Sequence, residues 1–283
     1  MAKIALVTDS TSYIPADLVQ RYQITVVPQV LIWGPETFAD GVDIQPDEFY
    51  TRLKTATIMP STSQATVATF VKIFQHLLDQ DYQILAILVS EKLSGTINSA
   101  TQAKAALHAG APIEIVDSQS TAMALGFQVL SVARALEQGE DLAGAVALAH
   151  KATAHTGVVL TVDTLEFLHR GGRIGGGKRF LGTALKIKPI LEVSGGRIEA
   201  VEQVRTRGKS LSRLVELVEQ QIAGRTPVRL AALHANAESD ARSVLEEACS
   251  RLKVDESLLS IVSPVVGTHA GPGTVGLAYM AGL

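Results

Sequence analysis

The chain of 283 residues carries a formal charge of −3, and its lysine and arginine residues are scattered along the sequence. This pattern offers no dense positive field for a polyanion and argues against a nucleic-acid partner. The length exceeds the usual single-domain range of roughly 100 to 150 residues, so two domains or one large α/β unit are expected. Hydrophobic residues make up 47% of the chain but aromatic residues only 5%, so the apolar content is aliphatic.

The cysteine content and the apolar runs predict a cellular location. The single cysteine, Cys249, cannot form an internal disulfide. No apolar stretch approaches the roughly 20 residues that span a bilayer. The apolar run Ile4 to Val7 is too short for the core of a signal peptide. We therefore expect a cytoplasmic protein without a transmembrane segment.

Residues 1–155 alternate short β-branched runs with longer segments of helical period, which is typical of a parallel sheet with crossover helices. The expected strands are Lys3 to Val7, Ile24 to Leu31, Gln83 to Val89 and Ile113 to Val116. The pattern predicts an N-terminal three-layer α/β/α domain with a mostly parallel sheet. Several of these strands end in small hydroxyl or acidic residues, at the edge where open α/β sheets bind ligands.

Residues 38–60 interrupt this alternation and are predicted to form an insertion or flap. Pro46 suits the first turn of a short helix that runs to Leu53. After the insertion, Ser61-Thr62-Ser63-Gln64 precedes an apolar-periodic helix from about Thr66 to Leu78, and a hydroxyl residue is the expected N-cap there.

Residues 156–283 follow a different pattern. Gly195-Gly196 lies between two β-rich runs and predicts a hairpin, hence antiparallel pairing. Further strands are expected at Val158 to Val162, Val228 to Leu233 and Leu258 to Val262, with helices at about Lys209 to Ala223 and Ser239 to Leu252. This predicts a C-terminal two-layer α/β domain with a mixed, largely antiparallel sheet.

Two motifs that suggest cofactor chemistry do not meet its requirements. Gly172 to Lys178 fits the phosphate-binding pattern G-x-x-x-x-G-K, but Arg179 stands where a metal-binding Ser or Thr is needed. The arginine and lysine residues of this segment favour a basic interaction surface over a nucleotide site. The histidines lack ligand spacing, so no metal and no cofactor are expected.

Small polar groups and glycine are dense in three motifs: Thr62-Ser63-Gln64, Leu93-Ser94-Gly95-Thr96 and His269-Ala270-Gly271-Pro272-Gly273. Each alone is weak, because a Ser or Thr before a helix is usually a cap. If the two domains face each other, however, these motifs bring hydroxyls, helix N-termini and an imidazole to one point. Those are the elements of a carboxylate or phosphate receptor.

In order and spacing, these motifs resemble the DegV family, together with Thr8-Asp9-Ser10-Thr11, Leu168 to Ile174 and Lys188-Pro189-Ile190-Leu191. The resemblance covers essentially the whole chain. It implies two α/β domains with a long-chain fatty acid, such as palmitate, in an apolar tunnel between them. It further implies a non-enzymatic protein that presents the acid to a partner kinase for acyl-phosphate formation.

Carried over by position, the resemblance assigns residue roles. It implies that Thr62 and Ser94 bind the carboxylate, beside Ser63 and Gly95, and that His269 and Arg205 support them. Arg170 and Arg173 are implied to contact the kinase. One departure is Ala65, which replaces the proline that commonly follows the glutamine of the Thr-Ser-Gln motif.

Other functions remain open from the residues alone. Ser94 and His269, with Asp9 or Asp117, have the composition of a hydrolase or acyltransferase triad, although no strained nucleophile turn is evident. A small ketose-binding protein is a second alternative, and a purely structural partner protein is a third. The sequence does not determine acyl chain length, saturation or oligomeric state.

Overall fold

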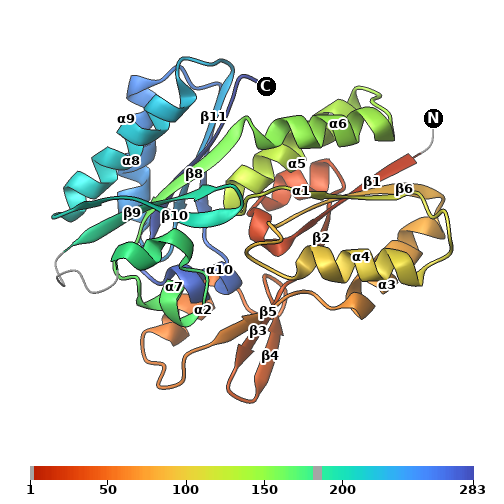
Figure 1. Ribbon diagram of the computed structural model, residues 1–283, viewed down its shortest axis with the longest axis horizontal. Coiled ribbons are helices and arrows are strands. Elements are labelled where there is room, and N and C mark those ends of the chain that lie inside the picture. Colours follow the sequence, from red (N-terminus) through yellow and green to blue (C-terminus); the bar gives the residue numbers. More distant parts are fainter. Residues whose placement is uncertain (1–2, 181–186) are drawn as a thin grey trace.

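The computed structural model describes residues 3–180 and 187–283. Its elements form a four-stranded sheet, a six-stranded sheet and a small three-stranded sheet (Figure 1). The four-stranded sheet has the order β2-β1-β6-β7, and every pairing in it is parallel. Its strands are β1 (Lys3–Asp9), β2 (Thr25–Val27), β6 (Tyr82–Leu88) and β7 (Ile113–Asp117).

Helices cover both faces of the parallel sheet because its strands are apolar on both sides. Val7, Ile84 and Ala86 face the core that includes α3 and α4, whereas Leu6 and Leu85 face the core that includes α5 and α6. The helices of this half are α1 (Ala16–Arg21), α3 (Val67–Leu78), α4 (Thr96–Ala106), α5 (Ala122–Glu137) and α6 (Leu142–Thr153), with a 3-10 turn η1 (Ser10–Ser12). The predicted three-layer arrangement is confirmed.

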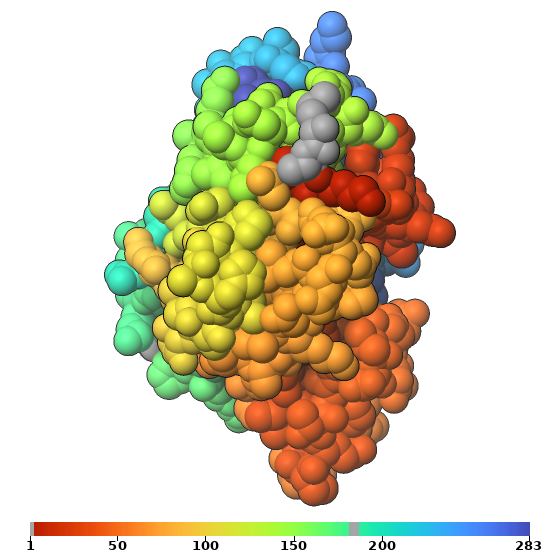
Figure 2. Space-filling model, turned by 90° about the vertical axis from the view of Figure 1, so that its right-hand side faces the viewer, coloured from red at the N-terminus to blue at the C-terminus, as the bar shows by residue number. Residues whose placement is uncertain are grey.

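The predicted insertion, residues 38–60, is part of a longer lobe that runs from β3 to β5 and projects from the lower part of the surface in Figure 2. Its antiparallel sheet has the order β4-β3-β5. The elements are β3 (Val30–Trp33), β4 (Glu36–Ala39), α2 (Pro46–Leu53) and β5 (Ser61–Ser63). The predicted helix at Pro46 is confirmed, but the single strand Ile24 to Leu31 is wrong. Pro28 lacks an N–H for a sheet ladder, and the chain passes there from β2 into β3.

The six-stranded sheet has the order β10-β9-β8-β13-β11-β12, and only β11 and β12 pair in parallel. The Gly195-Gly196 hairpin and the mixed, largely antiparallel sheet are confirmed. The strands are β8 (Thr156–Thr161), β9 (Lys188–Ser194), β10 (Arg197–Val204), β11 (Val228–His234), β12 (Glu256–Ile261) and β13 (Val275–Ala281). Helices α8 (Arg207–Ile222) and α9 (Glu238–Arg251) pack on one face of this sheet.

The opposite face of the six-stranded sheet turns toward the first half of the chain. Helix α5 contacts strands of both large sheets, and the largest apolar core contains residues from both halves. The division at residues 155 and 156 therefore stays a prediction. Three short elements complete the described chain, namely α7 (Glu166–Arg170), the 3-10 segment η2 (Gly175–Phe180) and α10 (Pro264–Ala270).

Helix α10 was not predicted, because glycine is frequent in and around the motif His269 to Gly273 and disfavours a helix. Its N-terminus follows capping rules: Ser263 accepts a hydrogen bond from the Val266 N–H, and Pro264 occupies the first turn. As a result, His269 lies in the last turn of a helix. Within residues 3–180 and 187–283, no helix combines the length and apolar character that crossing a bilayer requires.

Candidate functional site

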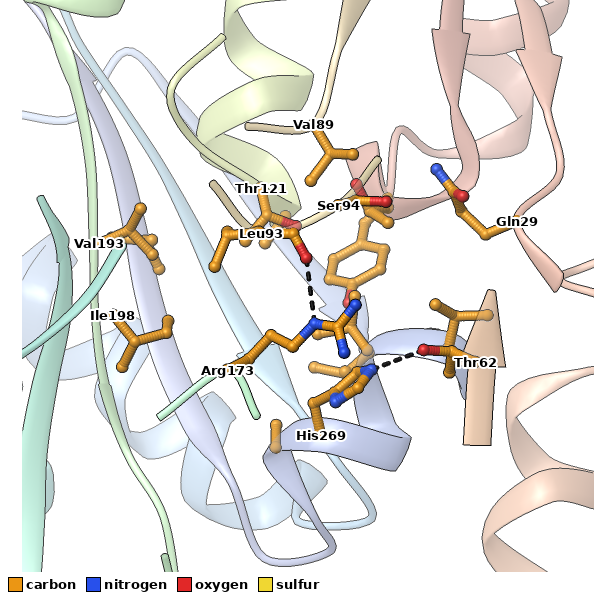
Figure 3. A pocket seen from close by; sticks show the side chains of 18 of the residues that line it. Gln29, Thr62, Val89, Leu93, Ser94, Thr121, Arg173, Val193, Ile198 and His269 are labelled. Atoms are coloured by element: carbon orange, nitrogen blue, oxygen red, sulfur yellow. Dashed lines mark hydrogen bonds between the residues drawn. The ribbon is translucent and has the colours of Figure 1, made fainter. Parts of the chain in front are cut away.

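A cavity lies between the two halves of the protein (Figure 3). About 950 Å³ of empty space lies within it when its open mouth is included. Its floor is the inner face of the six-stranded sheet, formed by Val158, Leu160, Val193, Ile198, Leu233 and Gly276. Further aliphatic side chains, from Val89 and Leu93 in the first half to Val265 and Val266 in α10, line much of the rest. Tyr13 and the hydroxyl residues Thr11, Thr121 and Thr274 are also in the lining. We refer to the part of the cavity that Thr62, Ser94, Arg173 and His269 border as its polar part.

Thr62 and His269 meet at this polar part of the cavity although they lie 207 positions apart. Strand β5 carries Thr62, and the end of α10 carries His269, so that Thr62 Oγ1 lies 2.7 Å from His269 Nε2. The backbone of Gly171 adjoins the imidazole, because a Cβ built there would lie 2.0 Å from His269 Nδ1. A glycine at position 171 is therefore required for this arrangement.

The imidazole of His269 is neutral at neutral pH. Burial lowers the pKa of His269 to about 4, and the nearby positive charge of Arg173 acts in the same direction. Its Nδ1 is buried and has no hydrogen-bond partner among the described residues. A neutral imidazole carries one N–H, so it can serve Thr62 either as donor or as acceptor.

Ser94 is held in place by a buried network that joins its loop to the Thr62 loop. Ser94 Oγ lies 2.8 Å from Thr96 Oγ1, which accepts a 2.9 Å hydrogen bond from the Gln29 amide nitrogen. The amide oxygen of Gln29 in turn accepts a 2.9 Å hydrogen bond from the Ala65 N–H. Because Gln29 is only 2% exposed, its contacts lock the two loops together.

The neighbours of Thr62 and Ser94 have different positions. Ser63 lines the cavity, as does Gln64. Gly95 adjoins the Gln64 amide, since a Cβ at position 95 would lie 3.1 Å from two of its atoms. Gly95 therefore permits close packing between the two loops, whereas Ser63 adds a hydroxyl group to the wall.

Arg173 lies in the cavity wall, which differs from the expected position on a partner-binding surface. Its Nε donates a 3.1 Å hydrogen bond to the Leu93 carbonyl (Figure 3). Its Nη1 donates a 2.7 Å hydrogen bond to the Gly171 carbonyl. From the sequence, Arg173 was grouped with the neighbouring cations. The sequence does not show where this side chain points, because its direction in a glycine-rich loop depends on tertiary contacts. Among the described residues that line the cavity, Arg173 is the sole cation and none is acidic.

The other two arginines lie elsewhere. Arg205 is exposed after the end of β10 and is not among the cavity-lining residues, so it does not join the network expected around His269. Arg170 is exposed at the end of α7, where it forms a 2.5 Å ion pair with Glu166. Of the two arginines expected at a partner surface, only Arg170 is therefore surface-exposed.

The hydrolase alternative does not match the hydrogen bonding. His269 Nε2 pairs with Thr62, and Ser94 pairs with Thr96, so the described bonds form no Ser94–His269 dyad. The candidate acids are engaged elsewhere: Asp9 accepts from Thr11 and Val89, and Asp117 accepts from the Gln119 N–H. No described acid orients the imidazole as a triad requires.

Gln29 and Thr96 are site residues that the sequence analysis missed. Thr96 lies within a motif that had been singled out, directly after Ser94-Gly95. Gln29 is a polar residue within the apolar run Ile24 to Leu31, and that interruption was an available signal. As for metals, the described residues contain no group of three or more His, Cys, Asp or Glu side chains able to hold one.

Comparison with known proteins gives consistent matches over nearly the whole chain. A family model described as an uncharacterised protein of the DegV family matches residues 3–282. A DegV domain-containing protein of Streptomyces coelicolor is 36% identical over 276 residues, which cover 97% of each chain.

Solved structures of similar proteins share the fold. A DegV family protein from Thermus thermophilus, described as binding fatty acid, is 33% identical with a TM-score of 0.93, and the match covers 99% of both chains. DegV from Bacillus subtilis, described as a fatty acid-binding protein, is 30% identical with a TM-score of 0.89, over 99% of this chain and all of that one.

Proposed function

This chain belongs to the DegV family, and from that premise we propose that it binds a long-chain fatty acid in the cavity between its two halves. The carboxylate would lie at the polar part formed by Thr62, Ser94, His269 and Arg173, and the alkyl chain would lie along the aliphatic walls. The solved relatives described as fatty acid-binding support this assignment.

The observation that carries the proposal is an uncompensated cation in an aliphatic cavity. Arg173 donates to two neutral carbonyl groups, and the described lining residues include no carboxylate to balance its charge. Arg173 is half-buried, and a charge that is partly withdrawn from water without a partner is costly, so a ligand carboxylate would supply the missing partner. A guanidinium is suited to a carboxylate by its geometry as well as its charge.

The hydroxyl groups complete the anion site. To donate its O–H to the ligand, Thr62 would accept a hydrogen bond from His269 Nε2–H, which a neutral imidazole can provide. Ser94 can donate in the same way when it accepts a hydrogen bond from the Thr96 hydroxyl, which itself accepts one from the Gln29 amide nitrogen. The ligand oxygens would thus receive two hydroxyl donors and one guanidinium.

The aliphatic walls would contribute through burial of the alkyl chain. Each methylene group that leaves water contributes about 0.8 kcal/mol, so a chain of about a dozen contributes on the order of 10 kcal/mol before the cost of association. Long-chain acids would therefore bind tightly and short-chain acids weakly.

Exposed cations before and after the glycine-rich segment that carries Arg173 suit a protein partner. Arg170 directly precedes Gly171, whose backbone adjoins His269, and Lys178 and Arg179 are also exposed. We propose that this surface contacts a kinase that phosphorylates the bound acid, so that the chain itself is the lipid-presenting, non-catalytic subunit. Reversal of Arg170 to Glu should then reduce acyl-phosphate formation by the kinase without lowering fatty-acid affinity.

Mass spectrometry of protein purified under non-denaturing conditions tests the lipid-binding function. We expect long-chain fatty acids to be released from the wild-type protein at close to one per chain. Arg197→Gln removes an exposed cation at the start of β10 and should retain the lipid. Absence of co-purified lipid, together with no binding of added palmitate, would refute the proposal.

A further inference from the structure

Gly276 lies in the middle of the cavity floor. In the sheet register it is paired with Leu160 of β8 on one side and with Leu233 of β11 on the other, and all three residues line the cavity. Its two paired neighbours each project a leucine side chain from the adjacent strand. Gly276 has no side chain, so the floor has a gap at β13.

The backbone does not require glycine at this position. Gly276 does not have a positive φ, and a Cβ built there would lie 3.4 Å from Leu160 Cβ, 3.4 Å from the Val159 carbonyl oxygen and 3.6 Å from Leu233 Cδ1. These are ordinary van der Waals distances, so alanine fits without displacing its neighbours. Glycine within a strand weakens the strand, and it often marks close approach of a ligand.

The next residue on the same face of β13 is Ala278, and its surroundings differ from those of Gly276. Ala278 is fully buried in the apolar core that includes α5, and it is paired with Val158 and Ala231. At Ala278 the protein itself covers the strand. At Gly276 the strand backbone borders the cavity.

We propose that the alkyl chain of the ligand passes directly against the β13 backbone at Gly276, and that the missing side chain sets the cavity width that an acyl chain requires. This inference rests on the proposed fatty-acid function and deepens it by naming a specificity-determining position. Gly276 contributes no polar group, so its effect is confined to the fit of the chain.

Replacement by larger residues separates this role from a structural one. The variants Gly276→Ala and Gly276→Val add progressively more volume to the floor, and both residues are compatible with a strand. We expect melting temperatures equal to or above that of the wild type. Affinity of the delipidated protein for palmitate should fall at least about fivefold for alanine, the lower limit expected from overpacking, and further for valine.

Gly208→Ala serves as the matched control, because Gly208 lies in α8 with no atom near its hypothetical Cβ. It should leave palmitate affinity unchanged. Equal affinity of the wild type and both Gly276 variants would overturn the inference and leave fatty-acid binding intact. A lower melting temperature for Gly276→Ala would instead assign the glycine a structural role and also overturn it. Failure of the wild type to bind any fatty acid would overturn both proposals.

Discussion

The two halves of the protein supply different chemistry to the polar part of the cavity. The first half provides neutral hydroxyl groups, Thr62 and Ser94, whose loops are joined through the side chain of Gln29. The second half provides the charge of Arg173, which one carbonyl from each half, Leu93 and Gly171, holds in place. It also provides the imidazole of His269, which packs against Gly171 and pairs with Thr62. The position of the Arg173 charge is therefore fixed by main-chain groups, whereas the position of the two hydroxyl groups depends on the buried side-chain amide of Gln29.

The largest effect is expected from removing the charge of the second half. Arg173→Gln keeps hydrogen-bond donors but leaves the ligand carboxylate without a cation. Loss of one partner of a buried charge pair costs about 2–5 kcal/mol, which corresponds to an affinity loss of about 30-fold or more. Titration of delipidated protein with palmitate measures this loss, with Arg197→Gln as the control for an exposed cation. Wild-type affinity in Arg173→Gln would show that the charge of the second half does not contribute to carboxylate binding.

Two titratable residues at opposite ends of α10 provide a second test. Asp40 of the first half accepts hydrogen bonds from Ser10 and from the Val265 N–H, near the N-terminus of α10, and burial raises the pKa of its carboxyl to about 6. His269, near the C-terminal end of α10, has its pKa lowered to about 4 by burial. Their effects on stability have opposite signs.

The folded state binds a proton at Asp40 more tightly than the unfolded state, so the contribution of Asp40 to stability is lost as pH rises from about 4 to 6. The folded state binds a proton at His269 more weakly, so its contribution is lost as pH falls from about 6.5 to 4. Each contribution amounts to about 3 kcal/mol, and the two nearly cancel each other in the wild type.

The variants should expose the two opposing slopes. Relative to the wild type at each pH, the free energy of unfolding of delipidated Asp40→Asn should rise as pH increases from 4 to 6.5, whereas that of His269→Gln should fall. Urea denaturation across this pH range measures both. Identical pH profiles of the two variants would contradict the assigned pKa directions.

Disruption of the amide that joins the two hydroxyl loops should have a smaller effect. Gln29→Leu leaves the buried Ala65 N–H without its acceptor, which costs about 1–3 kcal/mol of folding free energy. Palmitate affinity should also fall, because Thr96 and Ser94 lose their alignment. Gln75→Leu removes an exposed amide bonded to Asp79 and should change neither quantity. If both variants behave alike, the loops do not depend on Gln29.

The sequence predicted the elements whose signals are local. The Gly195-Gly196 hairpin, the helix that begins at Pro46 and the parallel strands β1, β6 and β7 follow from turn residues and apolar periodicity. Helix α10 was missed because Gly267 and the glycines after it outweighed the Ser263-Pro264 start signal. The positions of the candidate site residues depend on contacts between distant segments.

Arg173 and Arg205 illustrate this limit, since both are arginines in connecting segments and only tertiary packing distinguishes them. The Leu93 and Gly171 carbonyls draw Arg173 into the cavity wall, whereas Arg205 remains exposed. Thr62 and His269, by contrast, could be grouped in advance from the family resemblance. Their direct 2.7 Å contact could not be, because it requires the unpredicted helix α10.

The smallest expected effect concerns Ala65, where the family resemblance leads to the expectation of a proline. A proline there cannot donate to the Gln29 amide oxygen, and it also restricts Gln64 to extended conformations. Ala65→Pro should therefore lower stability by about 0.5–1.5 kcal/mol, and Ala65→Gly, which keeps the N–H, separates loss of the donor from loss of the methyl group. Equal or greater stability of Ala65→Pro, measured by urea denaturation, would mean that a preorganised loop outweighs the hydrogen bond. In that case the hydroxyl groups of the first half would be held by backbone geometry, as the charge of the second half is, and the distinction between the halves would not hold.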